Sequence, residues 1–500
     1  MSTAGTPDLA PGCVVEPSPD LRTVDGGRVL IGGAPLRLLR LADDGAAVVR
    51  RWFAGQPVGH SVANRRLARR LEEGGLAHIR WPTEPVAVDG SEPPGGRGTT
   101  PTVSIVVPTH DDGDELARTL ASLPTATTDV VVVDDGSVTP PRTGPEVRLV
   151  QRRDSGGPGA ARQTGLDATD SDLVVFVDAG VVLDDATLAG LIRAFDDPAV
   201  VAAAPRIRSE PLPHPVARYE LRRSPLDLGQ AESLVGPGRA VPYVPTACLA
   251  VRTDAVAAAG GFDLGLRYGE DVDLVWRLGR LGHVHYLPHL GAVHRPRPTL
   301  LTFVAQRRAY GSSAAPLALR HGDDTLAPCR VSGWTAAVVW LALGGRPLAA
   351  GLTAIGTGLA LAPKLEPLPD VRAEAMALTL RGHWYGGLSI VTAVARSWAP
   401  LVVVAPLFGA KAARLARMAM LAGLTRRLLD GPRQPGAAAI DLTMGAADDL
   451  AYAAGLWEGA VRHRTIGPLR PVIASWPDPG PSLRSRLSGL FDQVRRAIRR

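Results

Sequence analysis

Short apolar runs alternate with amphipathic stretches through the middle of the chain. The runs hold four or five residues, mostly apolar, and lie at 103–107, 130–133, 147–150, 173–177 and 200–204. Segments with helical periodicity separate them, at 115–122, 160–166 and 185–195. This alternation predicts an α/β domain with a parallel, doubly wound sheet. Such sheets bind ligands at the carboxyl ends of their strands, so the polar residues that follow each run are the first candidates for chemistry.

The N-terminal part has a different pattern. Residues 1–20 are small, polar and rich in proline, which predicts a disordered tail. Residues 21–82 predict a small α+β module with glycine-rich turns, a helix at 45–53 capped by Asp43 or Asp44, and a second helix that ends at Gly74-Gly75. Residues 83–102 are rich in Pro, Gly, Ser and Glu, and we expect a linker there.

Two long apolar stretches, 334–362 and 386–410, dominate the C-terminal part, and Arg346 and Arg396 interrupt them. A membrane span needs about 20 apolar residues, and an arginine near its centre costs a few kcal/mol. Two interpretations of 326–430 remain, a buried helical bundle and a membrane-associated region. The second predicts a location at the cytoplasmic face of the cell membrane.

Basic residues follow these stretches and suit an anionic membrane surface. They are Lys411, Arg414, Arg417, Arg426 and Arg427. Within a predicted helical region at 431–500, the segment 482–500 is a basic amphipathic helix candidate of the same kind.

Composition narrows the class of protein. The 500 residues carry a formal net charge of +6, which fits a small anionic ligand or an anionic membrane and does not favour nucleic acid. The three cysteines, Cys13, Cys248 and Cys329, lie far apart. This spacing disfavours a disulfide framework or a cysteine zinc site and favours a reducing compartment. The first 19 residues lack the basic and apolar segments of a signal peptide, and we expect none.

Polar motifs follow three of the predicted strands. The first is Val107-Pro108-Thr109-His110, the second Asp134-Asp135-Gly136-Ser137, and the third Phe176-Val177-Asp178-Ala179-Gly180. Asp and Gly are also ordinary turn residues, so each motif alone is equally a capped turn. A carboxylate at a strand end can also hold a hard divalent cation that bridges a diphosphate.

Two further motifs begin helices. Gly157-Pro158-Gly159-Ala160-Ala161-Arg162 opens a helix whose free N–H groups favour an anion, and Arg162 adds a positive charge. Gly269-Glu270-Asp271 places two acids in a first helical turn. Acids there are common helix caps, whereas a functional acid would serve as a general base.

In this order and spacing, the five motifs resemble those of the family 2 glycosyltransferases. The resemblance implies a GT-A nucleotide-diphospho-sugar transferase fold at 103–325. It also implies a UDP-sugar donor, a divalent cation (Mg or Mn), and an inverting displacement at the anomeric carbon in which metal and donor groups stabilise the diphosphate leaving group.

The resemblance assigns roles on the donor side. His110 and Asp135 would contact uracil and ribose, and Asp134 the nucleotide. Pro108 and Thr109 would belong to the same nucleotide-sugar site.

The remaining roles concern the diphosphate and the acceptor. Arg162 would lie near the base or the diphosphate, and Asp178 would be the first acid of the metal-binding DxD motif. Asp271 would deprotonate the acceptor hydroxyl, with Glu270 beside it.

The sequence departs from the family pattern at two places. The DxD motif reads Asp178-Ala179-Gly180, so its second acid is missing. His294, which follows a short apolar run at 286–293, is a candidate second metal ligand beside Asp178, although a lone histidine is more often structural. His110 stands where the family often has a tyrosine. Gln306-Arg307-Arg308-Ala309-Tyr310 only partly matches the motif of processive members, and it is a candidate lining of the acceptor or diphosphate side.

The whole layout, with the stretch Asp25-Gly26-Gly27-Arg28-Val29-Leu30-Ile31-Gly32-Gly33, resembles the mycofactocin-system glycosyltransferases of actinobacteria. This implies transfer of β-linked glucose from UDP-glucose onto mycofactocin or its precursor, a peptide-derived redox cofactor, with oligoglycosylation during its biosynthesis. The module at 21–82 resembles winged-helix, PqqD-like peptide-recognition modules, which implies a peptide partner that adds a strand to a sheet edge. A plain stabilising or dimerising module is the other interpretation.

Two other functions stay open at this point. The apolar tail favours a membrane-linked family 2 enzyme that makes a cell-envelope glycan or glycolipid. The shortened DxD motif leaves room for a non-catalytic scaffold that binds sugar nucleotides or peptides, but a scaffold has no need of the acids Glu270-Asp271.

Overall fold

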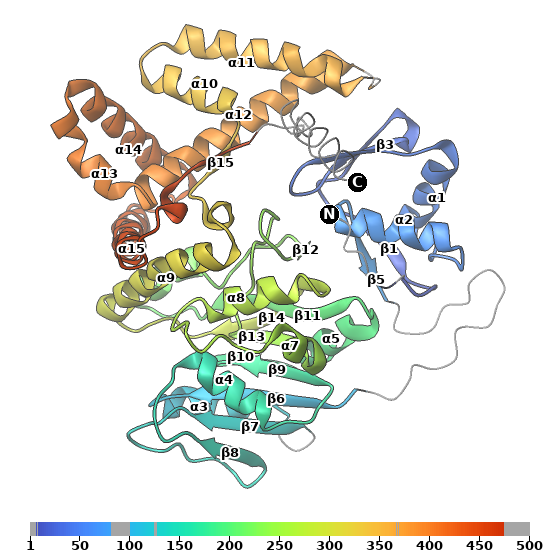
Figure 1. Cartoon of the computed structure of the whole chain (residues 1–500), viewed down its shortest axis with the longest axis vertical. Coiled ribbons are helices and arrows are strands. Elements are labelled where there is room, and N and C mark those ends of the chain that lie inside the picture. The colour runs from blue at the N-terminus through green and yellow to red at the C-terminus, as the bar shows by residue number, and fades with distance from the viewer. Residues whose placement is uncertain are drawn as a thin grey trace, which may run out of the picture.

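The computed structural model describes residues 7, 9–81, 101–124, 128–366, 368 and 370–474. An α/β domain fills the lower half of the view in Figure 1, and the N-terminal module and a group of C-terminal helices both lie above it, at the right and at the left. Most of the expected linker and the basic segment at 482–500 lie outside the described residues.

The central sheet has nine strands in the described part, in the order β10-β14-β11-β13-β9-β6-β7-β8, with β12 paired to β14. The four strands β6, β7, β8 and β9 are mutually parallel. Their bounds are β6 (Val103–Thr109), β7 (Asp129–Asp134), β8 (Val147–Gln151) and β9 (Leu173–Val177); the others are β10 (Val181–Leu183), β11 (Val200–Ser209), β12 (Ser233–Leu234), β13 (Cys248–Arg252) and β14 (His283–His294).

The α/β class is confirmed, and the five predicted strands, β6, β7, β8, β9 and β11, all run in the same direction, but the sheet as a whole is mixed. Strand β13 lies between β9 and β11 and is antiparallel to both, and β10 is antiparallel to β14. Neither β10 nor β13 is among the strands predicted from the sequence, and an apolar strand that is buried on both faces carries the same residue pattern whichever way it runs.

Buried side chains cover both faces of the sheet. In β7, Val130 and Val132 belong to one apolar cluster and Val131 and Val133 to the other, and all four are fully buried. This is the alternation expected of a strand between two layers of helices. The helices of the domain are α3 (Gly113–Ser122), α4 (Pro158–Asp167), α5 (Asp185–Arg193), α6 (Pro215–Arg223), α7 (Thr253–Ala259), α8 (Glu270–Leu278) and α9 (Leu300–His321).

The N-terminal module consists of two small sheets and two helices. Its elements are β1 (Val14–Pro17), β2 (Arg22–Val24), β3 (Val29–Gly32), β4 (Arg37–Arg40), α1 (Asp43–Phe53), α2 (Val62–Glu73) and β5 (Ala77–Arg80). Strand β1 pairs with β5, and Leu9, Cys13 and Val15 are buried in the module's core. The expected disorder of residues 1–20 is therefore wrong from Leu9 onward. The segment is mostly polar, but its few apolar residues are buried in the core of the module and hold the segment in place.

The C-terminal helices are α10 (Gly333–Leu343), α11 (Pro347–Leu361), α12 (Val371–Arg396), α13 (Ala399–Val404), α14 (Ala410–Asp430) and α15 (Pro435–Arg462). Beyond α15, a two-residue strand, β16 (Val472–Ile473), pairs with β15 (Arg330–Val331). Helix α15 packs closely on α9, since a Cβ atom at Gly455 would lie only 1.8 Å from the carbonyl oxygen of Arg308. Within the described residues, only Pro347–Leu365 is long and apolar enough by itself to cross a membrane; Val371–Arg396 and Ala399–Phe408 pass the same test as a pair bent by 77°.

Candidate active site

The ends of the parallel strands β6 and β7 place four predicted residues together. Thr109 and Asp134 are neighbours in register, and the amide of Asp135 donates to the carbonyl oxygen of Thr109 at 2.9 Å. His110 Nδ1 lies 3.0 Å from the carbonyl oxygen of Asp135. His110 is exposed, whereas Thr109 and both acids are buried. The imidazole is therefore the group of this set that is open to a ligand.

Asp135 holds the glycine-rich loop that leads into α4. Its carboxylate accepts from the amides of Gly156 and Gly157 at 3.1 and 2.8 Å and from the hydroxyl of Ser155. It also pairs with Arg152 Nε at 2.7 Å. Gly157 has φ of 86°, a conformation that side-chain-bearing residues avoid. Asp135 thus fixes the loop from which α4 begins, and its expected contact with the ribose stays a prediction.

Arg162, on α4, joins two acids that are far apart in the sequence. Its Nη2 lies 2.6 Å from Asp178 Oδ1 at the end of β9, and its Nη1 lies 2.9 Å from Glu270 Oε1 at the start of α8. The guanidinium is almost completely buried. Burial alone would lower its pKa, but the two carboxylates outweigh that effect and raise it. Three of the predicted site residues therefore form one buried ion-pair network.

Glu270 and Asp271 form the first turn of α8, after Gly269 in the left-handed conformation. Burial raises the pKa of Asp271 above its usual range. Burial and the neighbouring charge of Asp271 together raise the pKa of Glu270 to about 7. A carboxylate whose pKa is moved toward neutrality is a stronger base than an ordinary aspartate, which suits removal of a proton from a hydroxyl group.

Sequence comparison gives two matches that agree with this geometry. Residues 104–255 match the model of the family "Glycosyl transferase family 2". Two proteins from Mycobacterium tuberculosis, strains CDC 1551 and H37Rv, are each named pre-mycofactocin glycosyltransferase. Each is 35% identical to this chain over 495 residues, which covers 95% of this chain and all of the relative. The chain belongs to the pre-mycofactocin glycosyltransferase family.

Solved structures resemble this family 2 glycosyltransferase more distantly. The mannosyltransferase PcManGT from Pyrobaculum calidifontis, in complex with GDP-Man and Mn2+, is 17% identical, with a TM-score of 0.39 over 72% of this chain and 88% of that chain. GalNAc-T7 with UDP, GalNAc and Mn2+ is 16% identical, with a TM-score of 0.32 over 44% of this chain and 52% of that chain. The mixed α/β sheet of this glycosyltransferase and its match to the family model agree with the expected GT-A fold.

The two predicted metal ligands of the glycosyltransferase lie at one corner of the sheet. His294 ends β14 and pairs with Val181, three residues beyond Asp178. Burial lowers the pKa of His294 to about 4, although the charge of Asp178 acts in the opposite direction. The imidazole is thus neutral at pH 7 and keeps a lone pair for a metal, and about a third of the Asp178 side chain is exposed. These two groups fit a divalent cation whose other ligands would come from the donor diphosphate and water, and the assignment stays a prediction.

Three further residues lie near the site; Tyr243 and Arg297 belong to no motif recognised in the sequence, whereas Tyr310 belongs to the 306–310 segment. The charge of Asp271 raises the pKa of both Tyr243 and Tyr310, after the larger effect of burial, so both phenols lie near the expected base. Arg297, three residues beyond His294, is exposed. Its charge lowers the pKa of His294 and acts on Tyr310, which places it at the same corner.

Two residues of the 306–310 segment, Tyr310 and Arg307, lie in different surroundings. Tyr310 is close to Asp271, as stated above. Arg307 is instead fully buried and pairs with Glu220 at 2.6 Å and with Asp448 of α15 at 3.5 Å. Because Asp448 also pairs with Arg396 of α12, Arg307 connects the catalytic domain to the C-terminal helices and does not face an open acceptor site.

Proposed function

We propose that this enzyme transfers glucose from UDP-glucose onto pre-mycofactocin and adds further β-linked glucose units to the product. The named relatives support the acceptor. The observation that carries the reaction type is the juxtaposition of the Glu270-Asp271 acids with Arg162 and Asp178 at the carboxyl ends of β6, β7 and β9. A binding scaffold has no need of two adjacent carboxyl groups, one buried and one half-buried, whose pKa values are raised.

In the proposed reaction, Asp271 accepts the proton of an acceptor hydroxyl as that oxygen attacks the anomeric carbon of glucose. The bond between this carbon and the diphosphate oxygen breaks on the opposite side, so UDP leaves and the configuration inverts. A divalent cation held at Asp178 would offset the negative charge of the diphosphate. Glu270 and Asp178 hold the Arg162 guanidinium in place beside the proposed donor site.

A donor panel tests this proposal. The purified full-length enzyme would be incubated with pre-mycofactocin, Mg²⁺ or Mn²⁺, and UDP-glucose, UDP-galactose or GDP-mannose. We expect hexose additions by mass spectrometry with UDP-glucose and a divalent cation, and none after chelation. A preference for another donor would refute the proposed sugar, and hexose transfer in excess chelator would refute the proposed cation.

Arg297 is expected to bind the donor diphosphate. It is exposed at the corner that Asp178 and His294 share. Hydrogen bonds to charged groups contribute about 1.5–3 kcal/mol, so Arg297→Ala should weaken UDP binding by about 10–100-fold. Calorimetry with UDP and Mn²⁺ would measure this. The control is Arg148→Ala, because Arg148 is also exposed but pairs with Asp129 at the start of β7, at the opposite edge of the sheet. If the two variants bind UDP with equal affinity, Arg297 does not bind the donor diphosphate.

We also propose that helices α10 to α14 dock on the cytoplasmic face of the membrane. Their large apolar side chains are widely exposed, among them Trp334, Trp340, Leu348, Leu352, Trp384, Tyr385, Leu407 and Phe408. Exposed patches of this kind mark membrane or protein contacts, and the exposed Lys411, Arg414 and Arg417 on α14 add charge of the right sign. Arg427 is less suited to this role than expected, because it pairs with Asp449.

Vesicle binding measures this docking. Since each surface cation contributes about 1 kcal/mol, replacing Lys411, Arg414 and Arg417 by Gln should weaken binding to phosphatidylglycerol vesicles by about 100-fold. The matched control replaces Arg51, Arg153 and Arg208, which are exposed elsewhere. If both triple variants bind like the wild type, α14 is not the docking surface.

The exposed helices also favour a second candidate function, transfer to a membrane-bound glycan or glycolipid, which the same donor assay with lipid extracts would detect.

A further inference from the structure

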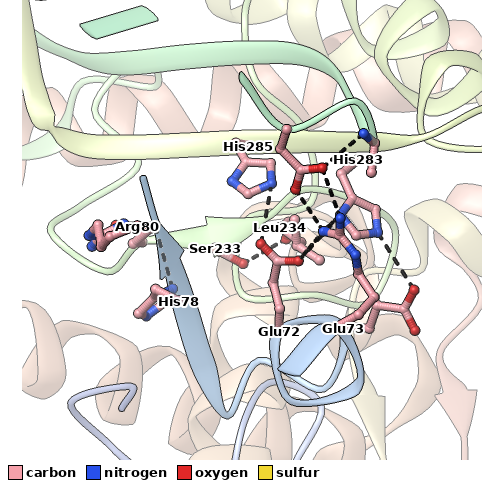
Figure 2. A network of polar contacts seen from close by, with 12 residues as sticks. Glu72, Glu73, His78, Arg80, Ser233, Leu234, His283 and His285 are labelled. Atoms are coloured by element: carbon pink, nitrogen blue, oxygen red, sulfur yellow. Dashed lines mark hydrogen bonds and ion pairs between the residues drawn. The ribbon is translucent and has the colours of Figure 1, made fainter. Parts of the chain in front are cut away.

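A cluster of metal-ligating side chains lies where the N-terminal module meets the catalytic domain. Glu72 of α2 faces His283 and His285 of β14 (Figure 2). One ligand atom from each of the three lies within 4.8 Å of the others. Glu72 Oε1 is 3.7 Å from His285 Nε2, and Glu72 Oε2 is 3.6 Å from His283 Nδ1. Ligand atoms of a tetrahedral zinc site lie about 3.3–3.6 Å apart, so the cluster needs little closure.

Two of these atoms are buried without a hydrogen-bond partner in the described part of the chain, namely Glu72 Oε1 and His285 Nε2. The Glu72 side chain is only 3% exposed. Such an unsatisfied group costs about 1–3 kcal/mol, and an ion bound between the two atoms would satisfy both.

His283 already has the tautomer that a metal requires. Arg69 Nη1 lies 3.2 Å from His283 Nδ1, and because a guanidinium can only donate, Nδ1 must carry the lone pair. The proton is then on Nε2, which faces Glu73 Oε1 at 3.7 Å. A carboxylate behind the far nitrogen of a histidine is the usual orienting partner of a metal-bound imidazole.

The charges around the cluster favour a cation. The carboxylates of Glu72, Glu73 and Asp197 outnumber the guanidinium groups of Arg69 and Arg239. Arg69 Nη1 also donates to Glu72 Oε2 at 2.5 Å, so Oε1 is the oxygen of Glu72 that is open to an ion. Because Arg69 makes two bonds of 2.8 Å to Asp197, it can release His283 Nδ1 and stay anchored.

We propose that Glu72, His283 and His285 form a binding site for a divalent transition metal, of which zinc fits the ligand set best. Cavities of about 320 and 100 Å³ both reach Glu72 and His285, which leaves room for water as a fourth ligand. Since one ligand comes from the module and two from the catalytic domain, the ion clamps the module onto the transferase. This site is separate from the donor cation at Asp178 and does not depend on the proposed acceptor.

Metal titration of the full-length chain tests the site. Asp178→Asn would be the background throughout, so that the donor cation does not contribute. After chelation, we expect one equivalent of Zn²⁺ to bind and raise the unfolding temperature, and Co²⁺ to give the visible bands of a tetrahedral site. His285→Gln should abolish binding, and Glu73→Gln should weaken it by about 10–100-fold. His289→Gln is the matched control, because this exposed histidine of β14 borders the same cavity but pairs with Glu232 and is not one of the three clustered ligands.

Two results would overturn the proposal. The first is that the Asp178→Asn protein binds no more zinc than the same protein with His285→Gln, in which case the cluster is an ion-pair contact organised by Arg69 alone. The second is the absence of tetrahedral Co²⁺ bands from the Asp178→Asn protein, which decides the matter even if the His285 variant does not fold.

Discussion

Replacing Asp271 by asparagine is expected to lower kcat by about 10²–10⁴-fold, the usual contribution of a general base, with little change in the Kd for UDP. Asparagine keeps the size of the side chain and can still accept the 2.8 Å hydrogen bond from the amide of Val272. It cannot take up the proton of the acceptor hydroxyl. Initial rates of hexose transfer and calorimetry with UDP measure the two quantities separately.

Asp254→Asn is the matched control for this variant. Asp254 also lies in the first turn of a helix, α7, and accepts from the next amide, that of Ala255 at 2.6 Å, but it is exposed and outside the site. Its variant should transfer hexose at the wild-type rate. If Asp271→Asn does so as well, the base is assigned to the wrong residue, and Glu270→Gln becomes the variant to measure.

Replacing Arg162 by methionine should lower the free energy of unfolding by about 3–5 kcal/mol at pH 8, because it leaves two carboxylates without their buried cation. Urea denaturation would measure the loss. Arg308→Met is the control, since Arg308 pairs with Glu458 at 2.8 Å on the surface. A surface pair of this kind contributes at most about 1 kcal/mol. Equal losses in the two variants would show that the Arg162 network does not stabilise the fold.

The loss in Arg162→Met should also depend on pH. The pKa of Glu270 is about 7 even beside Arg162, and removal of the guanidinium raises it further. A carboxyl group with a raised pKa in the folded state binds more protons there than in the unfolded chain, so its ionisation destabilises the fold as pH rises. The loss of unfolding free energy caused by Arg162→Met should therefore become smaller as the pH falls from 8 to 5. A deficit that grows toward low pH would contradict this assignment of charge.

The catalytic domain could be predicted largely from sequence because its signals are local. Apolar runs such as 130–133 define strands, and the residues after them, such as Asp134 and Asp178, must lie at the ligand edge of the sheet. The association of Arg162 with Asp178 and Glu270 follows from where the strand ends and helix starts meet, and the motifs located all three residues.

Other features depend on contacts between distant segments, which a local pattern does not encode. The direction of β13, and the pairing of β1 with β5 that orders Val14–Pro17, are set by tertiary neighbours. Tyr243 reaches Asp271 from a loop without a recognisable motif. Glu72 belongs to no motif in the sequence, and only the packing of α2 against β14 places it beside His283 and His285.

Mass spectrometry of the mycofactocin pool in host cells, with wild-type enzyme or Asp271→Asn, tests both the proposed acceptor and the proposed base. The variant should lose the species that carry hexose increments, while the bare aglycone accumulates. If the hexosylated cofactor persists unchanged in the variant, either the acceptor or the base is wrongly assigned, and an envelope glycan becomes the leading acceptor.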